Sequence, residues 1–166
     1  MNYLESERIL LRPVTRDDCD LIVKWRNDIE VSKWLFSKPV TRAECIEWFN
    51  SDRSNRLDYI ICASRIIKPI GTVQYKNIHN LYEVEAGKYI GDEMYRGNGY
   101  ATEAFKLWLM HGFNDLGFKK INIFTKADNK KNIILNLNLG FSIDSIYADP
   151  VSGGILKMTI SEKDLV

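Results

Sequence analysis

An arginine and two glycines stand directly before a run of strong helix formers at residues 95–104, which read YRGNGYATEA. Glycine weakens a helix or a strand from within, so a pair of glycines at this place needs a physical reason. The first N–H groups of a helix lack intrahelical acceptors, and a helix start therefore attracts anions. Two interpretations fit this segment: a tight turn between a strand and a helix, or a binding loop for a phosphate group.

The helix after this loop is expected from about residue 98 to residue 115. Its apolar residues recur with a period of about 3.6 residues, which is typical of a helix with one buried face. That face consists of Ala101, Ala104, Phe105, Trp108, Gly112, Phe113 and Leu116.

The other segments alternate between strand and helix patterns. Strands are expected at 8–14, 59–64, 70–75, 84–90, 121–125, 141–147 and 155–160, and helices after Thr15, after Thr41 and at 129–138. Thr41 and Glu44 form a capping box, and Lys68-Pro69 is expected to be a turn. The sequence thus predicts an α/β (α+β) fold in the order β-α-α-β-β-β-α-β-α-β-β. It has a single mixed, largely antiparallel sheet with about four helices, in one domain over residues 1–166.

The composition argues against several functions. Lysine and arginine total 23 and aspartate and glutamate total 22, so nucleic-acid or membrane-surface binding, which needs a basic excess, is not expected. Cys19, Cys45 and Cys62 are far apart, and we expect core residues rather than disulfides or metal ligands. No segment approaches the ~20 apolar residues of a membrane span. The N-terminus lacks a signal-peptide pattern, so a cytoplasmic protein is expected.

The glycine loop lacks the Gly-Lys-Ser/Thr of a Walker motif and the third glycine of the dinucleotide fingerprint. Instead, residues 96–101, Arg-Gly-Asn-Gly-Tyr-Ala, resemble the Arg/Gln-x-x-Gly-x-Gly/Ala motif of the GCN5-related N-acetyltransferases (GNAT). Residues 85–90 resemble the strand before that motif. Residues 129–141, with Asn129, Asn132 and Gly140-Phe141, resemble the family's Asn-x-x-Ser/Ala … Gly-Phe segment. The resemblance covers about residues 8–160, with its three motifs in the family's order.

This resemblance implies acetyl-coenzyme A (acetyl-CoA) as the cosubstrate, without a metal. Its pyrophosphate would lie on the backbone N–H groups at the helix start, near the Thr102 hydroxyl, and Asn129 would bind the pantetheine arm. The residues implied in cofactor binding are Ile90, Arg96, Gly97, Asn98, Gly99, Tyr100, Ala101, Thr102, Asn129 and Asn132.

The resemblance also implies direct attack of a neutral primary amine on the thioester. An alkyl amine has a pKa of about 10.4 and arrives mostly protonated, so a base is required. Glu85 is the predicted base, acting through water, and Glu83 is the alternative. Backbone N–H groups near Tyr89 and Ile90 are the predicted donors to the oxyanion. At the position of Asn136, many family members have a tyrosine that protonates the leaving thiolate.

Family members of this subtype place the first two helices over the acceptor. The residues predicted to bind it are Trp25, Arg26, Asn27, Trp34 and Phe36, because aromatic rings with interleaved polar groups suit a sugar or a nucleobase. The pattern resembles acetyltransferases of nucleotide-linked amino sugars, of the pseudaminic-acid pathway type, and also ribosomal-protein N-terminal acetyltransferases. A small-molecule amine, favoured as an amino sugar, is therefore expected. A protein N-terminus, another small amine and a CoA-binding sensor without turnover are the alternatives, and the chain is expected to be a monomer or a homodimer.

Overall fold

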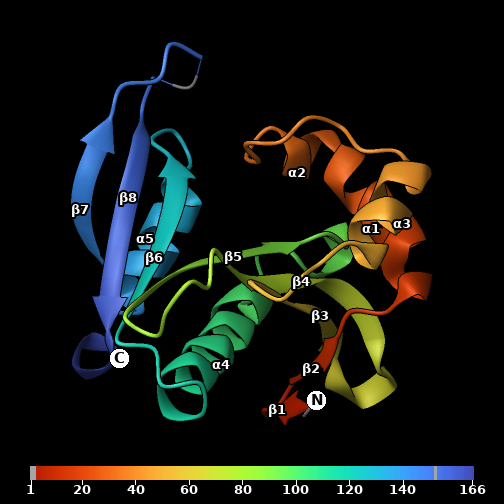
Figure 1. Ribbon diagram of the computed structural model, residues 1–166, viewed down its shortest axis with the longest axis horizontal. Coiled ribbons are helices and arrows are strands. Elements are labelled where there is room, and N and C mark those ends of the chain that lie inside the picture. Colours follow the sequence, from red (N-terminus) through yellow and green to blue (C-terminus); the bar gives the residue numbers. More distant parts are fainter. Residues whose placement is uncertain (1–2, 152) are drawn as a thin grey trace.

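The computed structural model describes residues 3–151 and 153–166, which form one eight-stranded sheet with helices on both faces (Figure 1). Neighbouring strands follow the order β1-β2-β3-β4-β5-β6-β8-β7. The strands are β1 (Leu4–Glu5), β2 (Ile9–Pro13), β3 (Leu57–Ala63), β4 (Lys68–Lys76), β5 (Glu83–Ile90), β6 (Lys120–Lys126), β7 (Ser142–Tyr147) and β8 (Ile155–Ser161). The α-helices are α1 (Cys19–Asn27), α2 (Ile29–Ser32), α3 (Arg42–Asn50), α4 (Tyr100–Asn114) and α5 (Lys130–Asn138).

The pair β5–β6 determines the shape of the sheet. It is parallel, whereas the other neighbouring strands are antiparallel, which confirms the predicted mixed and largely antiparallel sheet. The two strands pair only where Glu83–Glu85 faces Lys120–Asn122. Beyond these residues they separate, and β6, β8 and β7 turn away from the first five strands (Figure 1). The sheet is therefore open between residues 86–90 of β5 and residues 123–126 of β6.

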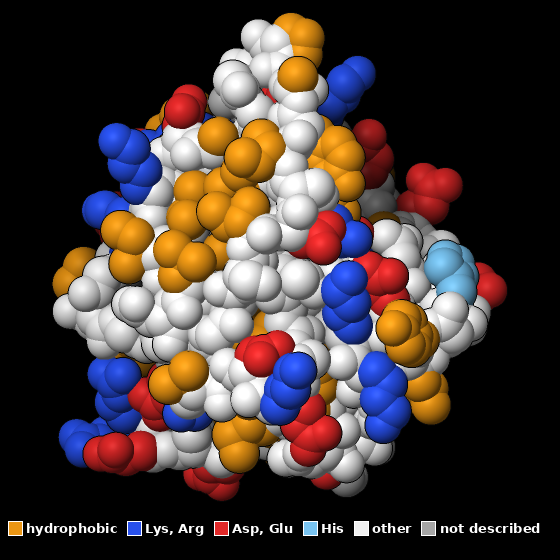
Figure 2. Space-filling model, turned by 90° about the vertical axis from the view of Figure 1, so that its left-hand side faces the viewer, with side chains coloured by type: hydrophobic (Ala, Val, Ile, Leu, Met, Phe, Trp, Pro, Cys, Tyr) orange, Lys and Arg blue, Asp and Glu red, His pale blue; other side chains and the backbone are white. Residues whose placement is uncertain are grey.

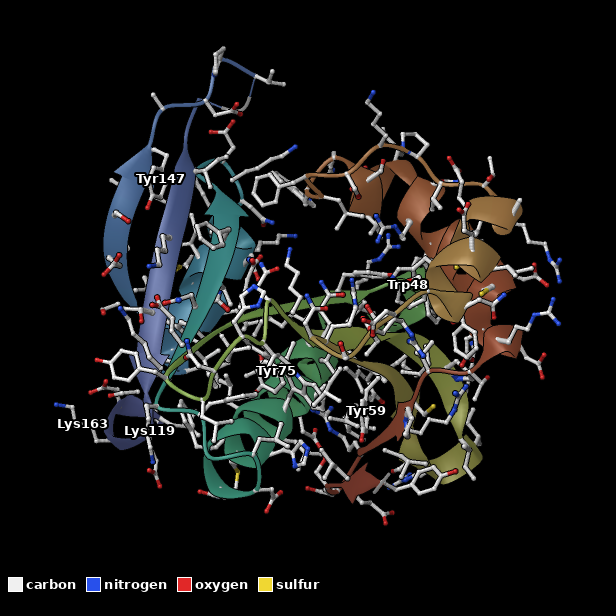
Figure 3. All side chains as sticks on the ribbon, viewed as in Figure 1. Trp48, Tyr59, Tyr75, Lys119, Tyr147 and Lys163 are labelled. Carbon is white, nitrogen blue, oxygen red and sulfur yellow. The ribbon has the colours of Figure 1, made fainter. Side chains whose placement is uncertain are left out.

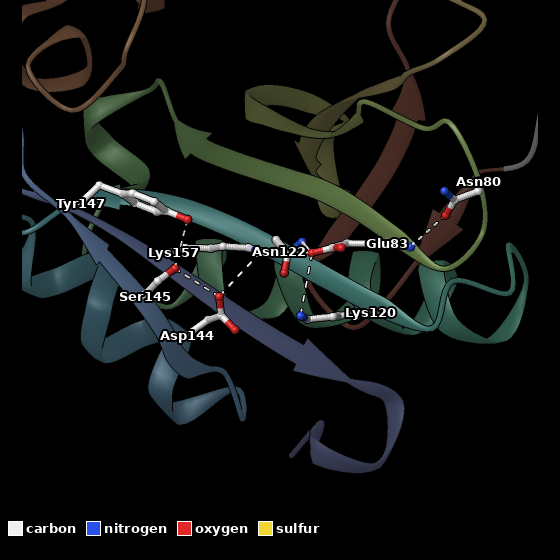
Figure 4. Close-up of polar contacts among 8 residues, drawn as sticks. All are labelled: Asn80, Glu83, Lys120, Asn122, Asp144, Ser145, Tyr147 and Lys157. Carbon is white, nitrogen blue, oxygen red and sulfur yellow. Dashed lines mark hydrogen bonds and ion pairs between the residues drawn. The ribbon is translucent and has the colours of Figure 1, made fainter.

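A polar cluster holds the closed end of this opening together (Figure 4). Glu83 on β5 accepts hydrogen bonds from Asn122 on β6 and from Lys157 on β8, the latter at 3.1 Å. Lys120 lies 3.8 Å from the same carboxylate oxygen. The bond from Asn122, and then that from Lys157, lowers the pKa of Glu83, so its carboxylate is ionised at neutral pH. These contacts join β5, β6 and β8 at the end of the sheet where β5 and β6 still pair.

Two hydrophobic clusters lie on opposite faces of the sheet. On one face, α4 contributes Phe105 and Trp108 to a core that includes Ile61 and Tyr75 from the strands. On the other face, α1 and α3 cover a smaller cluster that contains all three cysteines. These cysteines are buried free thiols, so the expectation that they are core residues is confirmed.

The predicted turn at Lys68-Pro69 is wrong, because both residues belong to β4. The turn lies before them at residues 64–67, where Ile67 adopts a left-handed φ of 51°. Pro69 lies opposite Cys62, next to a register shift in β3. Proline donates no ladder hydrogen bond and is tolerated in a strand at such irregularities.

Smaller differences concern the ends of elements. The sequence pattern does not predict β1, and α2 begins just before the stretch 32–39 that is expected to be irregular. Helix α4 begins at Tyr100, slightly later than expected, since Gly99 has a left-handed φ of 81°. Within the described residues, no helix has the length and hydropathy that crossing a membrane requires.

Apolar side chains also gather over α5 and the edge strand β7, on the side of the molecule that Figure 2 shows. These residues expose between 46 % and 68 % of their surface and are Ile134, Leu137, Ile143, Ile146 and Tyr147. Strand β7 is the last strand of the sheet. Edge strands are places where chains associate, so both predicted oligomeric states, monomer and homodimer, stay open.

Candidate active site

Two glycines with left-handed backbone shape the loop before α4. Gly97 has a φ of 76° and Gly99 a φ of 81°, which strain residues other than glycine. The N–H of Glu103 donates to the carbonyl oxygen of Gly99 at 3.1 Å. The preceding N–H groups, of residues 100–102, therefore have no acceptor within the helix. They form a set of donors at the positive end of a 15-residue helix, where an anion is favoured.

An ion pair fixes this first turn of α4 to the start of β2. Glu103 accepts hydrogen bonds from the Nε of Arg8 at 2.7 Å, from the Arg8 backbone N–H at 2.9 Å and from the Ser6 hydroxyl at 2.8 Å. Arg8 also donates to the carbonyl oxygen of Asn98 at 3.1 Å and lies 4.6 Å from the centre of the Tyr100 ring. A cation thus lies beside the glycine loop. Because Arg8 lies about 90 residues before this loop in the chain, no local sequence pattern predicts the contact.

Arg96 turns toward β5 and not toward the loop glycines. Its Nε donates to the carbonyl oxygen of Ile90 at 3.1 Å and its Nη2 to that of Gly91 at 2.6 Å. Asp28, just before α2, lies 3.5 Å from the same guanidinium. Arg96 therefore holds the end of the strand, and its predicted direct contact with the cofactor stays a prediction.

The backbone of β5 directs selected N–H groups into the opening. In a strand, the backbone N–H and C=O groups of alternate residues point to the same neighbouring strand. The N–H of Gly91 donates to the carbonyl oxygen of Ile70 on β4 at 2.8 Å, so Tyr89 and Gly91 face β4 with their backbone groups. Lys88 and Ile90 face the opposite side, toward β6. Of the two predicted oxyanion donors, the N–H of Ile90 points into the opening and that of Tyr89 does not.

The side chain of Lys88 spans the opening toward α5. Its ammonium donates to Oδ1 of Asn136 at 2.8 Å and to Oδ1 of Asn132 at 3.0 Å, and it lies 4.0 Å from the centre of the Phe105 ring. Asn132 in turn donates to the Thr125 hydroxyl on β6 at 3.0 Å. Burial lowers the pKa of Lys88 to about 7. The sequence did not predict this network, although alternation along β5 places the Lys88 side chain on the same face as the buried residues Val84, Ala86 and Ile90.

The two predicted cofactor residues of α5 lie in its first turn. Asn129 is the N-cap, and its side chain accepts a hydrogen bond from the backbone N–H of Asn132 at 3.3 Å. The side chain of Asn132 belongs to the Lys88 network described above. The start of α5 thus borders the opening on the side of β6, and the cofactor contacts of Asn129 and Asn132 stay predictions.

Glu85 lies where β5 and β6 separate, and alternation along the strand places its side chain on the face opposite to Lys88. Its carboxylate pairs with Lys76 at 2.7 Å and accepts a hydrogen bond from Asn77 at 2.9 Å, and 19 % of the side chain is exposed. Glu83, the alternative base, is engaged by the polar cluster at the closed end. Both carboxylates are thus engaged by a lysine and an asparagine, and Glu85 as the base stays a prediction with Glu83 as its alternative.

A cavity of about 300 Å³ lies between the sheet and the helices α1 and α3. Trp48 from α3 (Figure 3) and Tyr89 from β5 supply its aromatic walls, and Arg26 from α1 and Arg56 line it as well. The ring of Tyr59 points to the other face of the sheet, where its centre lies 4.8 Å from that of Trp108. Trp48 was not among the acceptor residues predicted from the sequence. The cavity combines flat apolar surfaces with cationic groups.

The two carboxylates that line this cavity are engaged in other interactions. Asp58 pairs with Arg56 through hydrogen bonds of 2.7 and 2.6 Å. Glu44 accepts hydrogen bonds of 2.7 Å from the backbone N–H and the hydroxyl of Thr41, which confirms the predicted capping box. Burial raises the pKa of Tyr89 to about 12, so its phenol is neutral. The charge of Asp58 is thus compensated by Arg56, whereas Glu44 is held at the start of α3 by neutral groups.

Of the five predicted acceptor residues, Arg26 lines the cavity. Trp25 is 4 % exposed and packs against Gly91, where an added Cβ would lie 2.1 Å from the indole ring. Asn27 forms two hydrogen bonds with the backbone of Val40, at 2.8 and 2.9 Å. Trp25 and Asn27 therefore support the strand end and the following loop, and they do not form the cavity wall.

Trp34 and Phe36, the other two, lie on the segment after α2, which approaches the end of β6. Lys126 on β6 donates to the carbonyl oxygen of Lys33 at 2.8 Å and lies 5.9 Å from the centre of the Phe36 ring. Phe36 is 54 % exposed. These aromatic residues are placed near the far end of the opening, outside the cavity.

Comparison with known proteins agrees with this geometry. Residues 8–142 match the acetyltransferase (GNAT) domain family. Spermidine N(1)-acetyltransferase of Escherichia coli (strain K12) is 26 % identical over 143 residues, covering 84 % of this chain and 75 % of the relative. The structure of spermidine N-acetyltransferase from Vibrio cholerae in complex with CoA and spermine has a TM-score of 0.87 at 19 % identity, covering 96 % and 98 % of the two chains. A GNAT-family acetyltransferase from Bacillus anthracis has a TM-score of 0.84 at 16 % identity, covering 98 % and 99 %.

The residues present fit acetyl-CoA. Free N–H groups at the start of α4 suit its pyrophosphate, and the open edge of β5 suits an extended arm with amide groups. Among the described residues, the buried Nδ2 of Asn136 has no hydrogen-bond partner, which indicates that a further group belongs beside it. Because the family match spans most of its length, this chain is an acetyl-CoA-dependent enzyme that belongs to the GNAT acetyltransferase family.

Proposed function

We propose that this enzyme transfers the acetyl group to a primary amine of a sugar that also carries an anionic group, as a nucleotide-linked amino sugar does. The cavity beneath α1 and α3 is the observation that carries this proposal. Its aromatic walls suit the faces of a sugar or a base, and Arg26 is a suitable partner for a phosphate. Its volume of about 300 Å³ suits part of such an acceptor, with the remainder in the opening.

A polyamine is the second candidate, because the curated relative is named for spermidine. A polyamine carries several ammonium groups and needs uncommitted carboxylates in its site. Asp58 is paired with Arg56, and Glu44 caps α3, so neither cavity carboxylate is free for this task. The guanidinium of Arg26, by contrast, donates to a neutral group, the Ser37 hydroxyl, and its charge suits an acceptor that carries an anionic group.

Each step of the transfer has a residue that supports it. The N–H groups of residues 100–102 bind the pyrophosphate and place the thioester along β5. The N–H of Ile90 faces the carbonyl oxygen that becomes negative as the amine adds. Glu85 accepts the proton of the amine through water, since its carboxylate is partly exposed on the face of the sheet that α1 and α3 cover.

The test is thiol release from acetyl-CoA with three acceptors in parallel: a UDP-linked 4-amino-4,6-dideoxy sugar, spermidine, and a short peptide with a free serine or alanine N-terminus. Fast release with the nucleotide sugar is expected. Release with spermidine alone or with the peptide alone would replace the proposed acceptor class. Binding of CoA without release from any of the three acceptors would support a sensor.

A matched pair of variants tests the cavity itself. Arg26→Met removes the proposed phosphate partner, and a charge-assisted hydrogen bond contributes about 1.5–3 kcal/mol, so KM for the sugar should rise roughly tenfold or more. The KM for acetyl-CoA should stay unchanged. Arg42→Met is the control, because Arg42 is 65 % exposed and pairs with Asp20 on the surface. Equal effects of both variants would contradict the placement of the acceptor.

A further inference from the structure

Two hydrogen-bond donors without partners meet on the α5 side of the opening. A lysine ammonium has three N–H donors, and two of those of Lys88 are used by Asn132 and Asn136. Among the residues that the structure describes, the third has no hydrogen-bond acceptor and is available to a ligand. The Nδ2 of Asn136 is buried and lacks a partner among the described residues, and Asn136 itself is 0 % exposed. A buried polar group of this kind is costly unless a ligand or water satisfies it.

These donors lie beside the position that the thioester occupies in the proposed reaction. The N–H of Ile90 faces the opening, and Lys88 is two residues away on the same edge of β5, about 7 Å along the strand. The Lys88 side chain starts there and ends at α5. Asn132 and Thr125 connect the same point to β6. The ammonium therefore lies between the two strands that flank the cosubstrate.

We propose that Lys88 protonates the sulfur of coenzyme A as the thioester bond breaks, and that the Nδ2 of Asn136 donates a hydrogen bond to the same sulfur. This inference rests on the proposed function. The amine nitrogen bonds to the carbonyl carbon, the carbon–sulfur bond breaks with its electron pair on sulfur, and sulfur takes a proton from the Lys88 ammonium. Lys88 becomes a neutral amine and regains a proton from solvent, which receives the one that the acceptor nitrogen loses.

The surroundings of Lys88 suit such a donor. In the part of the chain that the structure describes, the groups that contact its ammonium are neutral: two asparagine oxygens from α5 and the Phe105 ring from α4. Burial lowers the pKa of Lys88 to about 7, so it exchanges a proton near neutral pH. An alkyl thiol has a pKa of about 8.5, and beside a positive charge this value falls toward that of Lys88, so the proton passes between two groups of similar pKa.

The test uses free coenzyme A, so it needs no acceptor. The thiolate absorbance of bound coenzyme A is followed against pH in the wild type, Lys88→Met and Lys88→Arg. An opposite charge within about 4–6 Å lowers the pKa of an acid by roughly 1–3 units, so the bound thiol should ionise well below its usual pH in the wild type. It should ionise at or above its usual pH in Lys88→Met. Lys88→Arg keeps the charge and should retain the lowered thiol pKa.

Turnover separates proton donation from charge alone. Arginine does not release its proton, so Lys88→Arg should lower kcat by roughly 10²–10⁴-fold, the usual contribution of a general acid. In the wild type, kcat should decline at high pH as Lys88 loses its proton, and this decline should be absent in Lys88→Arg. Lys106→Met, at an exposed position of α4, is the control and should resemble the wild type in both measurements.

The outcomes distinguish this inference from the function on which it rests. If coenzyme A binds and the thiol titrates alike in the wild type and Lys88→Met, the role of Lys88 is wrong while use of the cosubstrate stands. Unchanged kcat in Lys88→Arg would also overturn proton donation. If coenzyme A does not bind the wild type, both proposals fail.

Discussion

Asp18, immediately before α1, is held by four hydrogen bonds. Two come from the Arg12 guanidinium, at 2.8 and 2.6 Å, and two from Thr15, at 2.7 Å from its N–H and 2.9 Å from its hydroxyl. Burial by itself raises the pKa of Asp18, but the bonds from Arg12 and Thr15 outweigh it and the pKa is lowered. The folded protein therefore holds an ionised carboxylate whose side chain is only 5 % exposed.

Asp18→Asn should destabilise the protein at neutral pH by about 3 kcal/mol, because it leaves the charge of Arg12 in a partly buried place without its partner. The contribution of a carboxylate with a lowered pKa is present above the unfolded pKa, about 3.9, and is lost as the pH falls through the folded value. Urea unfolding should thus show a difference that shrinks in acid. The surface pair of Asp20 and Arg42 gives the control, Asp20→Asn, with an expected change within about 1 kcal/mol.

At the scale of elements, α4 packs tightly against a side chain of β4 at Gly112. A Cβ added at Gly112 would lie 2.2 Å from the hydroxyl oxygen of Tyr75, which donates to the carbonyl oxygen of Trp108 at 2.8 Å. Glycine inside a helix lowers its stability by about 0.8–1.0 kcal/mol relative to alanine. The close contact with β4 is the reason for this glycine.

Gly112→Ala should destabilise the protein by about 1–3 kcal/mol, because overpacking exceeds the gain in helix propensity. Removing the hydroxyl in Tyr75→Phe should relieve part of this loss, since the ring carbon Cζ would still lie 2.8 Å from the added Cβ. The double variant should therefore be more stable than the sum of the single changes predicts, as denaturant unfolding would measure. If the changes in the free energy of unfolding of the two single variants simply add in the double variant, the proposed steric contact between residue 112 and Tyr75 is wrong.

The sequence was informative about elements whose signals are local. The capping box of Thr41 and Glu44 and the apolar face of α4 depend on residues one turn apart, and both are confirmed. The turn at Lys68-Pro69 was predicted wrongly, because proline normally marks a turn whereas here a register shift in the neighbouring strand admits it. Such a shift involves residues distant in sequence and leaves no local pattern.

At the scale of the molecule, the site depends on contacts between distant segments. The separation of β5 from β6 and the cavity under α1 and α3 follow from packing. The sequence therefore pointed to the glycine loop before α4 but to neither Arg8 nor Trp48, and the role of Glu85 stays a prediction. Lys88 did leave a signal. It shares the parity of Val84 and Ala86, which are buried, and a lysine at such a position indicates a specific partner.

The binding of coenzyme A is tested most directly by amide NMR spectra of the isotope-labelled protein during titration with coenzyme A. The signals of residues 97–102 should shift, together with those of Lys88 and Ile90 on the open edge of β5. The signal of Ile60, which lines the cavity under α1 and α3, should change little. Shifts confined to that cavity or to the apolar surface of β7, or no shifts at all, would contradict the placement of the cosubstrate between β5 and β6.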